Sequence, residues 1–329
     1  MSDTVSWVVG RGGLLGRSVE TELSRWGHTW YPRQAFDWTS VVSAKSQIEA
    51  ASADFSQTVG DAAWHIAWCA GSGVIGESRD SLNDESVLLE CLLTQISHRF
   101  RGKRALKGTF FLASSAGGIY AGAEHPPFSE DSPARPTSEY GVMKLLQEEL
   151  VRSFAAASRT SVLIGRITTL YGPGQNIRKR QGLISQVCLR ALWRQPLILY
   201  VPLDIQRDYL YSVDAARIIA SCLHRMQTAS RRNGIGQLVI KNIASQRPVT
   251  VSTILAGVKK ILKRPISIIS GDPPGRVHHP VDLRVTSNVW RDIDQLPMTT
   301  LSEGIRSVVI DLSALIAKGD TRDLLTTLN

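Results

Sequence analysis

A glycine-rich turn between an apolar strand and an amphipathic helix opens the chain. A buried strand is expected over residues 5–10 and a helix over 14–27. The turn that joins them is Gly10-Arg11-Gly12-Gly13-Leu14-Leu15-Gly16. In such a turn Gly10 permits a tight bend, Gly13 lets the backbone approach a pyrophosphate, and Gly16 lets the helix pack closely on the sheet. Free N–H groups at a helix start favour phosphate, so the turn predicts a dinucleotide site. A glycine turn without a ligand is the alternative.

The first half of the chain alternates short apolar runs with longer amphipathic segments. Further strands are expected at 28–33, 62–70, 109–114 and 161–167, and helices within 82–99 and over 140–157. On the last helix the apolar residues Leu145, Leu146, Leu150, Val151 and Phe154 fall on one side. This alternation predicts right-handed crossovers and a doubly wound parallel α/β sheet of the Rossmann type.

The pattern becomes less regular after Tyr171. We therefore predict a dinucleotide-binding domain over residues 1–170, to which 209–240 return. A smaller C-terminal α/β lobe that binds the substrate is predicted over 171–208 and 241–329.

Composition narrows the range of functions. The net charge is +9, but Lys and Arg are scattered and are not interleaved with aromatic residues, which argues against nucleic-acid binding. An acidic small-molecule substrate accounts for the charge as well. No run approaches the roughly 20 apolar residues of a membrane span, and the start lacks the features of a signal peptide, so we expect a cytoplasmic location. The 4 cysteines form no CxxC pair, which predicts reduced thiols and no metal site.

The end of the second strand bears on the cofactor. A carboxylate that grips the adenosine ribose is usual there, but the chain has Trp30-Tyr31-Pro32-Arg33-Gln34. Arg33 and Arg11 instead favour a 2′-phosphate, hence NADP over NAD. The alternative is that Arg33 is solvated and Arg11 caps the loop. Asp37 and Trp38 follow and are predicted to flank the adenine.

A Tyr-x-x-x-Lys motif begins the helix over 140–157. Residues four apart share a helix face, so Lys144 lies one turn beyond Tyr140. A nearby ammonium favours the phenolate of a tyrosine, whose ordinary pKa is about 10, and makes it a better base. Ser114 and Ser115 end the preceding strand and supply a hydroxyl that orients the substrate oxygen. This set suits hydride chemistry on a secondary alcohol.

The chain resembles the NAD-dependent epimerase/dehydratase family, the extended short-chain dehydrogenases. The resemblance rests on GRGGLLG, WHIAWCAG, FFLASSAGGIYAG, FSEDSPARPTSEYGVMK, GRITTLYGPGQ, QRDYLYSVDAAR and TTLSEGIRSVV. It implies that Tyr140, Lys144 and Ser115 are catalytic, with Ser114 close enough to compete with Ser115. It also implies cofactor contacts from the glycines, Leu14, Leu15, Ala70 and Gly71.

Most members of that family act on nucleotide-diphosphate sugars. The resemblance places a diphosphate-binding arginine at Arg207 and a second candidate at Arg276. Thr169 stands where the family usually has a substrate-binding asparagine. Residues 116–118 lack the Asp-Glu pair of the sugar dehydratases, which argues against dehydration.

Two activities remain open at this point. The family majority favours 4-epimerisation through a keto intermediate, whereas Arg11 and Arg33 favour an NADPH-dependent reductase of a 4-keto nucleotide sugar. A dinucleotide-sensing protein without catalysis is a further alternative. The resemblance also implies a homodimer through the helices near 82–99 and from Tyr140. Residues 91–93 line that interface or face the core.

Overall fold

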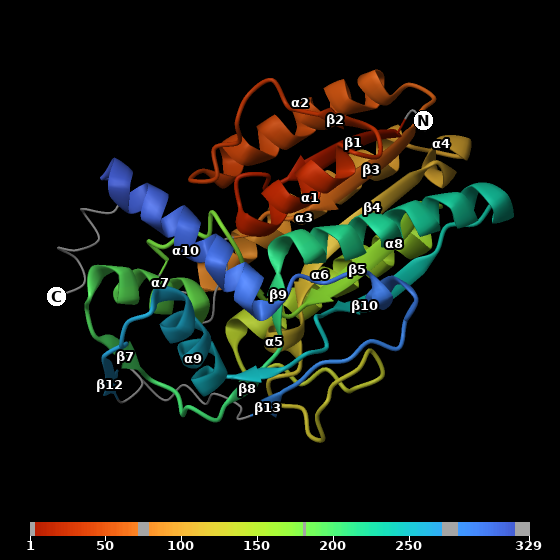
Figure 1. The fold of residues 1–329 in the computed structure, drawn as a ribbon. Helices are drawn as coiled ribbons and strands as arrows, with labels where there is room; N and C mark the ends of the chain where they lie inside the picture. Colours follow the sequence, from red (N-terminus) through yellow and green to blue (C-terminus); the bar gives the residue numbers. More distant parts are fainter. Residues whose placement is uncertain (1–3, 72–78, 180–181, 272–281, 320–329) are drawn as a thin grey trace.

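The computed structural model describes residues 4–71, 79–179, 182–271 and 282–319, and of residues 79–81 the backbone alone. Figure 1 shows a large sheet flanked by helices, beside a smaller lobe.

Within the described ranges, six parallel strands form the main sheet. These strands are β1 (Thr4–Val9), β2 (His28–Trp30), β3 (Ala63–Trp68), β4 (Gly108–Ser115), β5 (Ser161–Ile167) and β10 (Leu238–Ile243). Their spatial order is β10-β5-β4-β3-β1-β2, which confirms the predicted Rossmann-like sheet. The order reverses between β1 and β3, and ligands of such sheets bind in the crevice at the carboxyl ends of the strands on either side of this point.

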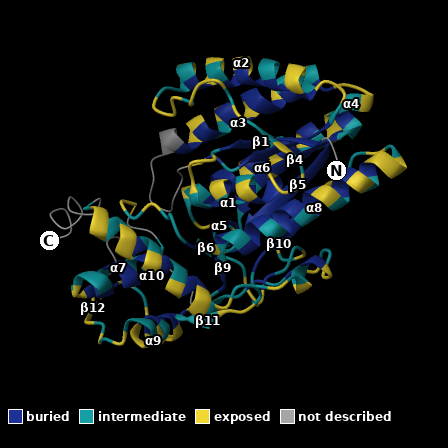
Figure 2. Cartoon of the chain, turned by 45° about the horizontal axis from the view of Figure 1, so that its top comes forward, coloured by how far each residue is buried: buried dark blue, intermediate teal, exposed yellow. Residues whose placement is uncertain are grey.

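Helices cover both faces of the sheet. One face carries α2 (Val41–Val59), α3 (Arg79–Arg99) and α6 (Glu139–Ala157), and the other carries α1 (Leu14–Leu23) and α8 (Ser212–Asn233). Each face of the sheet has its own hydrophobic core, and successive side chains of a strand point into one core and then the other. Trp7 therefore packs toward α2, and Val8 packs toward α1 and α8. Figure 2 shows the strands as a buried layer between the helices.

Three local expectations differ from the structure. Strand β2 ends at Trp30, because Pro32 has no N–H to continue a ladder. Helix α2 follows, although no helix was predicted there. Helix α6 does not bury Leu146, whose side chain is 53% exposed. Its buried face is instead Gly141, Met143, Lys144, Gln147, Glu148, Val151 and Phe154.

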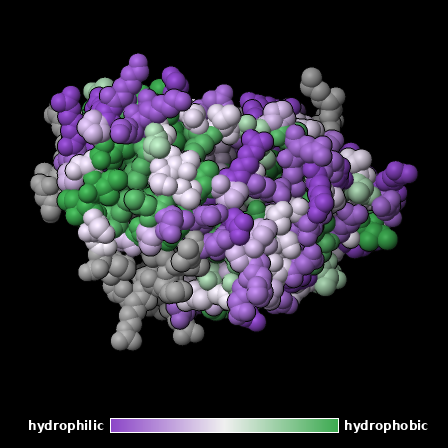
Figure 3. All heavy atoms as spheres, turned by 60° about the horizontal axis from the view of Figure 1, so that its bottom comes forward, coloured by the Kyte–Doolittle hydropathy of each residue, from purple (hydrophilic) through white to green (hydrophobic). Residues whose placement is uncertain are grey.

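The smaller lobe has its own core. It is built from α7 (Leu183–Trp193), α9 (Val251–Leu262), α10 (Leu301–Lys318) and the parallel pair β7 (Leu197–Leu199) and β12 (Ile268–Ser270). Ile198 on β7 and both Ile268 and Ile269 on β12 are exposed. Figure 3 shows hydrophobic residues gathered on the left, the side on which Figure 1 places this lobe.

The remaining elements are short. They are α4 (Lys103–Leu106), α5 (Ala116–Ile119), β6 (Thr169–Tyr171), β8 (Gln206–Arg207), β9 (Tyr209–Tyr211), β11 (Val249–Thr250), β13 (Asp282–Leu283) and a 3-10 turn (Ile293–Gln295). Strand β6 follows β5 beyond the carboxyl end of the main sheet. It pairs with β9, which leads into α8. The chain thus returns to the main sheet through α8 and β10.

Candidate active site

The glycine turn between β1 and α1 is tightly packed at Gly10 and Gly16 and more open at Gly13. Gly10 has φ +86°, and a Cβ there would lie 2.4 Å from the backbone nitrogen of Ala70. A Cβ at Gly16 would lie 2.2 Å from the Gly10 carbonyl oxygen, so both positions require glycine. At Gly13 the nearest such contact is 3.4 Å, which leaves room above the turn.

The start of α1 is suited to bind an anion. Helix α1 begins at Leu14 with Gly13 as N-cap, and no side chain caps it. The N–H groups of Leu14, Leu15 and Gly16 belong to the first turn, where helices leave donors unsatisfied. Uncapped donors beside a close-packed glycine turn fit a dinucleotide pyrophosphate.

Ser115 and Tyr140 border the same glycine. Ser115 ends β4, and its Oγ accepts a hydrogen bond from the Gly118 N–H at 3.1 Å. A Cβ at Gly118 would lie 3.1 Å from Cε1 of Tyr140, and one at Gly141 would lie 2.2 Å from the Gly118 carbonyl oxygen. The close approach of α5 to the start of α6 therefore brings the tyrosine beside the serine.

Ser114 belongs to a different environment. Its side chain is buried, and its Oγ donates to Glu148 Oε1 at 2.7 Å. Arg166 donates to both oxygens of the same carboxylate, at 2.9 and 2.8 Å. Ser114 therefore belongs to a buried hydrogen-bond network with Glu148 and Arg166 at the carboxyl end of β4. Of the two serines, Ser115 is the one that lies beside Tyr140.

Lys144 is held by groups that sequence reasoning did not identify. Its Nζ lies 5.8 Å from the centre of the Tyr140 ring. It donates to Glu85 Oε1 at 2.7 Å and to Gln147 Oε1 at 3.0 Å. Burial by itself would lower the pKa of Lys144, but Glu85 and Tyr140 raise it above its ordinary value. Lys144 is therefore a cation at neutral pH.

A sequence signal for Glu85 exists in α3. The inward positions of this helix are Leu82, Glu85, Leu89, Leu92 and Ile96, spaced by three and four residues. Glu85 is the acid in this otherwise apolar stripe. A buried carboxylate requires a partner, so the stripe indicates a buried cation nearby.

The two arginines predicted near the adenosine each hold a carboxylate. Arg11 Nε donates to Glu20 at 2.9 Å, and its guanidinium lies 4.4 Å from the centre of the Tyr31 ring. Arg33 pairs with Asp54 of α2 at 3.2 Å. A cavity of ≈ 570 Å³ lies beside this pair, between residues 32–36 and α2.

Asp37 and Trp38 lie on the loop between β2 and α2. Asp37 accepts hydrogen bonds from the hydroxyl and N–H of Thr39 at 2.6 and 3.1 Å, and these bonds lower the pKa of its carboxyl. Trp38 is 47% exposed and meets Trp68 of β3 edge-on at 6.5 Å. This contact places an exposed indole near the carboxyl end of β3.

Two of the predicted substrate residues lie on the short strands β6 and β8. Thr169 is exposed on β6, and its N–H donates to the Asp208 carbonyl at 3.1 Å. Arg207 is half-buried on β8, between β11 and β13, and burial lowers its pKa. Arg276 lies outside the described residues.

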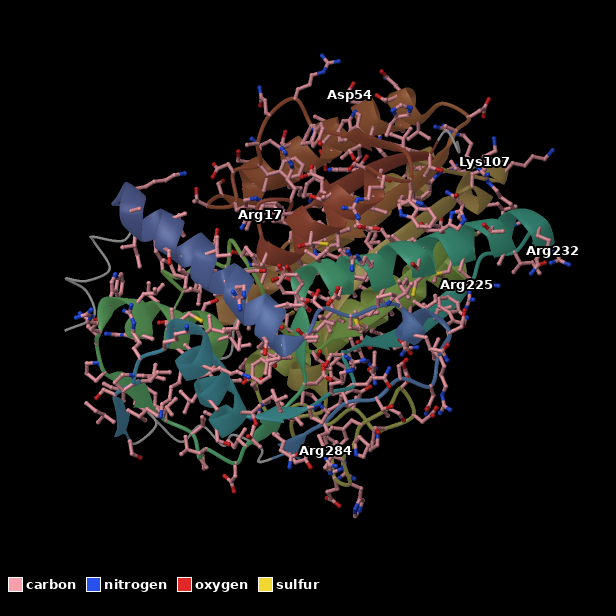
Figure 4. All side chains as sticks on the ribbon, viewed as in Figure 1. Arg17, Asp54, Lys107, Arg225, Arg232 and Arg284 are labelled. Carbon is pink, nitrogen blue, oxygen red and sulfur yellow. The ribbon has the colours of Figure 1, made fainter. Side chains whose placement is uncertain are left out.

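The two parts of the molecule also meet beside the glycine turn. Arg17 of α1 donates to the carbonyl of Gly174, and the Gly174 N–H donates to Asp311 of α10 at 2.7 Å. In Figure 4, Arg17 lies between α1 and α10, whereas Asp54 lies on α2 at the top of the view.

The described part of the chain holds no group of three or more His, Cys, Asp or Glu side chains suited to a metal ion. Among its helices, none combines the length and the apolar character that a membrane span requires.

The chain matches parts of several known proteins, and two of them show the range of activities. A dTDP-L-rhamnose 4-epimerase of Burkholderia thailandensis is 31% identical over 112 residues, which are 34% of this chain and 31% of that protein. A dTDP-4-dehydro-6-deoxyglucose reductase of Escherichia coli is 25% identical over 197 residues, 60% of this chain and 59% of that protein. The matches thus span less than two thirds of either relative.

The fold extends further than these sequence matches. The UDP-glucose 4-epimerase of Thermus thermophilus, solved in complex with NAD, superposes with a TM-score of 0.71 at 19% identity. The superposition covers 94% of this chain and 99% of that one. The model of the NAD dependent epimerase/dehydratase family matches residues 7–235. This match covers more than half of the sequence, and the chain belongs to the NAD dependent epimerase/dehydratase family.

Proposed function

We propose that the protein is an NAD(P)-dependent enzyme that inverts C4 of a nucleotide-diphosphate sugar through a keto intermediate. One observation carries the proposal: Ser115, Tyr140 and Lys144 gather at the carboxyl side of the sheet. The uncapped glycine turn lies at the neighbouring reversal of strand order. A proton acceptor, a cation and an orienting hydroxyl beside a dinucleotide cradle suit the oxidation of a secondary alcohol.

When bound, a nicotinamide dinucleotide supplies the acceptor and donor of a hydride. Tyr140 Oη takes the proton of the sugar 4-hydroxyl as the C4–H bond gives up its hydride. Tyr140 later returns the proton to the keto oxygen, after the sugar has presented its other face. Ser115 Oγ accepts from Gly118, so its own hydrogen is available to the substrate oxygen.

The substrate's diphosphate is assigned to Arg207. A guanidinium binds phosphate through its bidentate fork, and this one is half-buried on β8. Arg276 and Thr169 complete the proposed substrate side. Both partial relatives are named for dTDP-linked sugars, which supports a nucleotide sugar here. Residues 116–118 offer no carboxylate, so dehydration is not proposed.

A second candidate is an NADPH-dependent reductase of a 4-keto nucleotide sugar. The observation in its favour is the end of β2, where Arg33 and nearby Arg11 stand without a ribose-binding carboxylate. A relative named as a reductase, the dTDP-4-dehydro-6-deoxyglucose reductase of Escherichia coli, also matches 60% of the chain. On this ground NADP is slightly favoured over NAD as cofactor.

One experiment separates the candidates. The purified protein is first analysed for bound dinucleotide and then incubated with UDP- and dTDP-sugars, with and without NADPH. Isomerisation without net absorbance change at about 340 nm supports the epimerase, and stoichiometric NADPH loss supports the reductase. Cofactor binding without turnover of any sugar would contradict both and favour a dinucleotide sensor.

A further inference from the structure

Glu85 forms a closed triangle with Lys144 and Gln147. Lys144 Nζ donates to Glu85 and Gln147 at 2.7 and 3.0 Å, and Gln147 Nε2 donates to the same oxygen of Glu85 at 3.0 Å. The side chains of Lys144 and Glu85 are 8% and 9% exposed, so water screens the pair little. This is a buried ion pair on a residue of the proposed catalytic set.

The carboxylate also borders the proposed cofactor site. A Cβ at Gly71 would lie 2.7 Å from both carboxylate oxygens of Glu85, and Gly71 has φ +140°. Gly71 follows β3, whose end packs against the glycine turn through Ala70. Glu85 therefore joins α3, the carboxyl end of β3 and α6 at one point.

Three ionisable groups face Lys144. They are Glu85 on α3, Tyr140 on its own helix and Cys69 after β3. Burial raises the pKa of the Cys69 thiol, so this group is neutral at physiological pH. Among the described residues that act on Lys144, Glu85 is thus the one that offsets its charge near neutral pH.

We propose that Glu85 is a positioning residue that offsets the charge of Lys144 and thereby sets the pH range in which Tyr140 accepts a proton. The inference rests on the proposed role of Tyr140. An unpaired ammonium near the phenol would favour the phenolate strongly, whereas a paired one favours it less. Glu85 therefore shifts proton abstraction toward higher pH. Two N–H groups of Lys144 are used by Glu85 and Gln147, which leaves one for a bound ligand.

Glu85→Gln tests this proposal, because it retains the shape and hydrogen-bonding capacity while removing the charge. The acidic limb of the pH–rate profile for sugar oxidation should move down by about one pH unit. Glu85→Asp keeps the charge and should restore the wild-type profile. Glu90→Gln makes the same chemical change at an exposed site on α3 and should leave the profile unchanged.

A second readout needs neither substrate nor cofactor. The ionisation of Tyr140 is followed by ultraviolet difference spectroscopy, with Tyr140→Phe as the subtracted reference. Glu85→Gln should move this ionisation down by about one pH unit, and should have no effect in a Lys144→Met background. Because this titration requires no turnover, a chain that acts on no sugar still tests the role of Glu85.

Superimposable titrations of the wild type and Glu85→Gln would overturn the proposal, and so would an equal shift in the Lys144→Met background. If Glu85→Gln does not fold, Glu85→Asp decides the matter. A downward shift of the Tyr140 titration in this charge-retaining variant would contradict the proposal, and an unchanged titration would support it.

Discussion

At the scale of the residue, Tyr140 depends on two glycines that fix its surroundings. A side chain at Gly141 would collide with the Gly118 backbone, and one at Gly118 would press on the tyrosine ring, so the two glycines let α5 and α6 approach closely. Ser115 is tied to Gly118 by its Oγ. The phenol and the serine are thus pre-positioned before a substrate binds, which is how a site limits the entropy cost of reaction.

Tyr140→Phe should reduce turnover of the sugar by about 10²- to 10⁴-fold, because the proton acceptor is lost while the ring that packs on Gly118 is kept. Binding of the dinucleotide, measured by fluorescence titration, should stay within about twofold of the wild type. A variant with near-normal turnover would show that another group takes the proton.

Arg33→Asp should lower the preference for NADP over NAD by at least roughly tenfold, since a carboxylate repels a 2′-phosphate and accepts from a ribose hydroxyl. The ratio of kcat/KM for the two cofactors is the measurement. Asp54→Asn is the control, because it frees Arg33 from its ion pair without adding a charge at the ribose. An unchanged ratio in Arg33→Asp would remove the case for NADP.

Single residues also show how far the sequence could be read. Spacing alone brought Tyr140 and Lys144 to one helix face, but the choice between Ser114 and Ser115 needed the structure. The two side chains lie on opposite sides of the end of β4, and the hydroxyl of Ser114 donates a hydrogen bond to Glu148. The stripe on α3 marks Glu85 as a buried acid, but no local pattern identifies its partner Lys144, which is 59 positions away.

At the scale of the element, helix α6 departs from the expected pattern in part. Its buried face includes Lys144, Gln147 and Glu148, and its exposed face carries Leu146. Apolar periodicity therefore predicted the helix and the buried Val151 and Phe154, but not the buried polar residues or the exposure of Leu146. Paired charges can replace apolar contacts when each polar atom has a partner, as Glu148 and Arg166 show. The end of β2 and the start of α2 were missed although each has a local signal, Pro32 for the strand and the capping residue Ser40 for the helix.

A polar row crosses the strands near their amino ends. Ser6, His65, Thr109 and Ser161 are register partners on β1, β3, β4 and β5, and all are buried. His65 Nδ1 is hydrogen bonded to the Thr109 hydroxyl. Burial lowers the pKa of His65 to about 3, so the imidazole is neutral in the folded chain.

Acid should weaken the fold through His65. Its folded-state pKa of about 3 lies below the unfolded value, so the unfolded chain takes up the proton first as pH falls. The free energy of unfolding should therefore fall between about pH 6.5 and pH 3, by roughly 2–3 kcal/mol at pH 4.5. Urea unfolding at pH 7 and pH 4.5 measures this loss. His65→Gln should reduce it, and His98→Gln at an exposed position of α3 should not. An equal loss in His65→Gln would place the acid sensitivity elsewhere.

At the scale of the whole molecule, the main sheet and the smaller lobe each have their own hydrophobic core, and the proposed site takes residues from more than one part. The main sheet supplies the glycine turn and Tyr140, while β8 supplies Arg207. Arg17 and Gly174 join α1 to the loop that precedes the small lobe. Fold class followed from the alternation of strands and helices. The sequence also predicted a smaller C-terminal lobe but not its internal pairing, because the strands β7 and β12 are short and pair across a long stretch of intervening chain.

The helices α3 and α6 lie side by side on one face and expose apolar residues. Val87 on α3 is 42% exposed, and Val142 and Leu146 on α6 are 43% and 53% exposed. Residues 91–93, a possible interface in the sequence, lie in the core instead. Exposed valine and leucine on adjacent helices suit a two-fold contact in which the same patch serves both copies. This supports the proposal of a homodimer through α3 and α6.

Leu146→Glu should convert that dimer to a monomer, because it places a charge at the centre of the apolar contact in both copies at once. Light scattering coupled to gel filtration gives the mass in solution. Ile310→Glu makes a similar change on α10, where Ile310 is 64% exposed on the smaller lobe, and should leave the mass unchanged. A monomeric wild type, or a Leu146→Glu variant that keeps the dimer mass, would contradict the proposed interface. Because Lys144 lies on the buried face of α6 and Leu146 on the exposed one, the monomeric variant should retain cofactor binding.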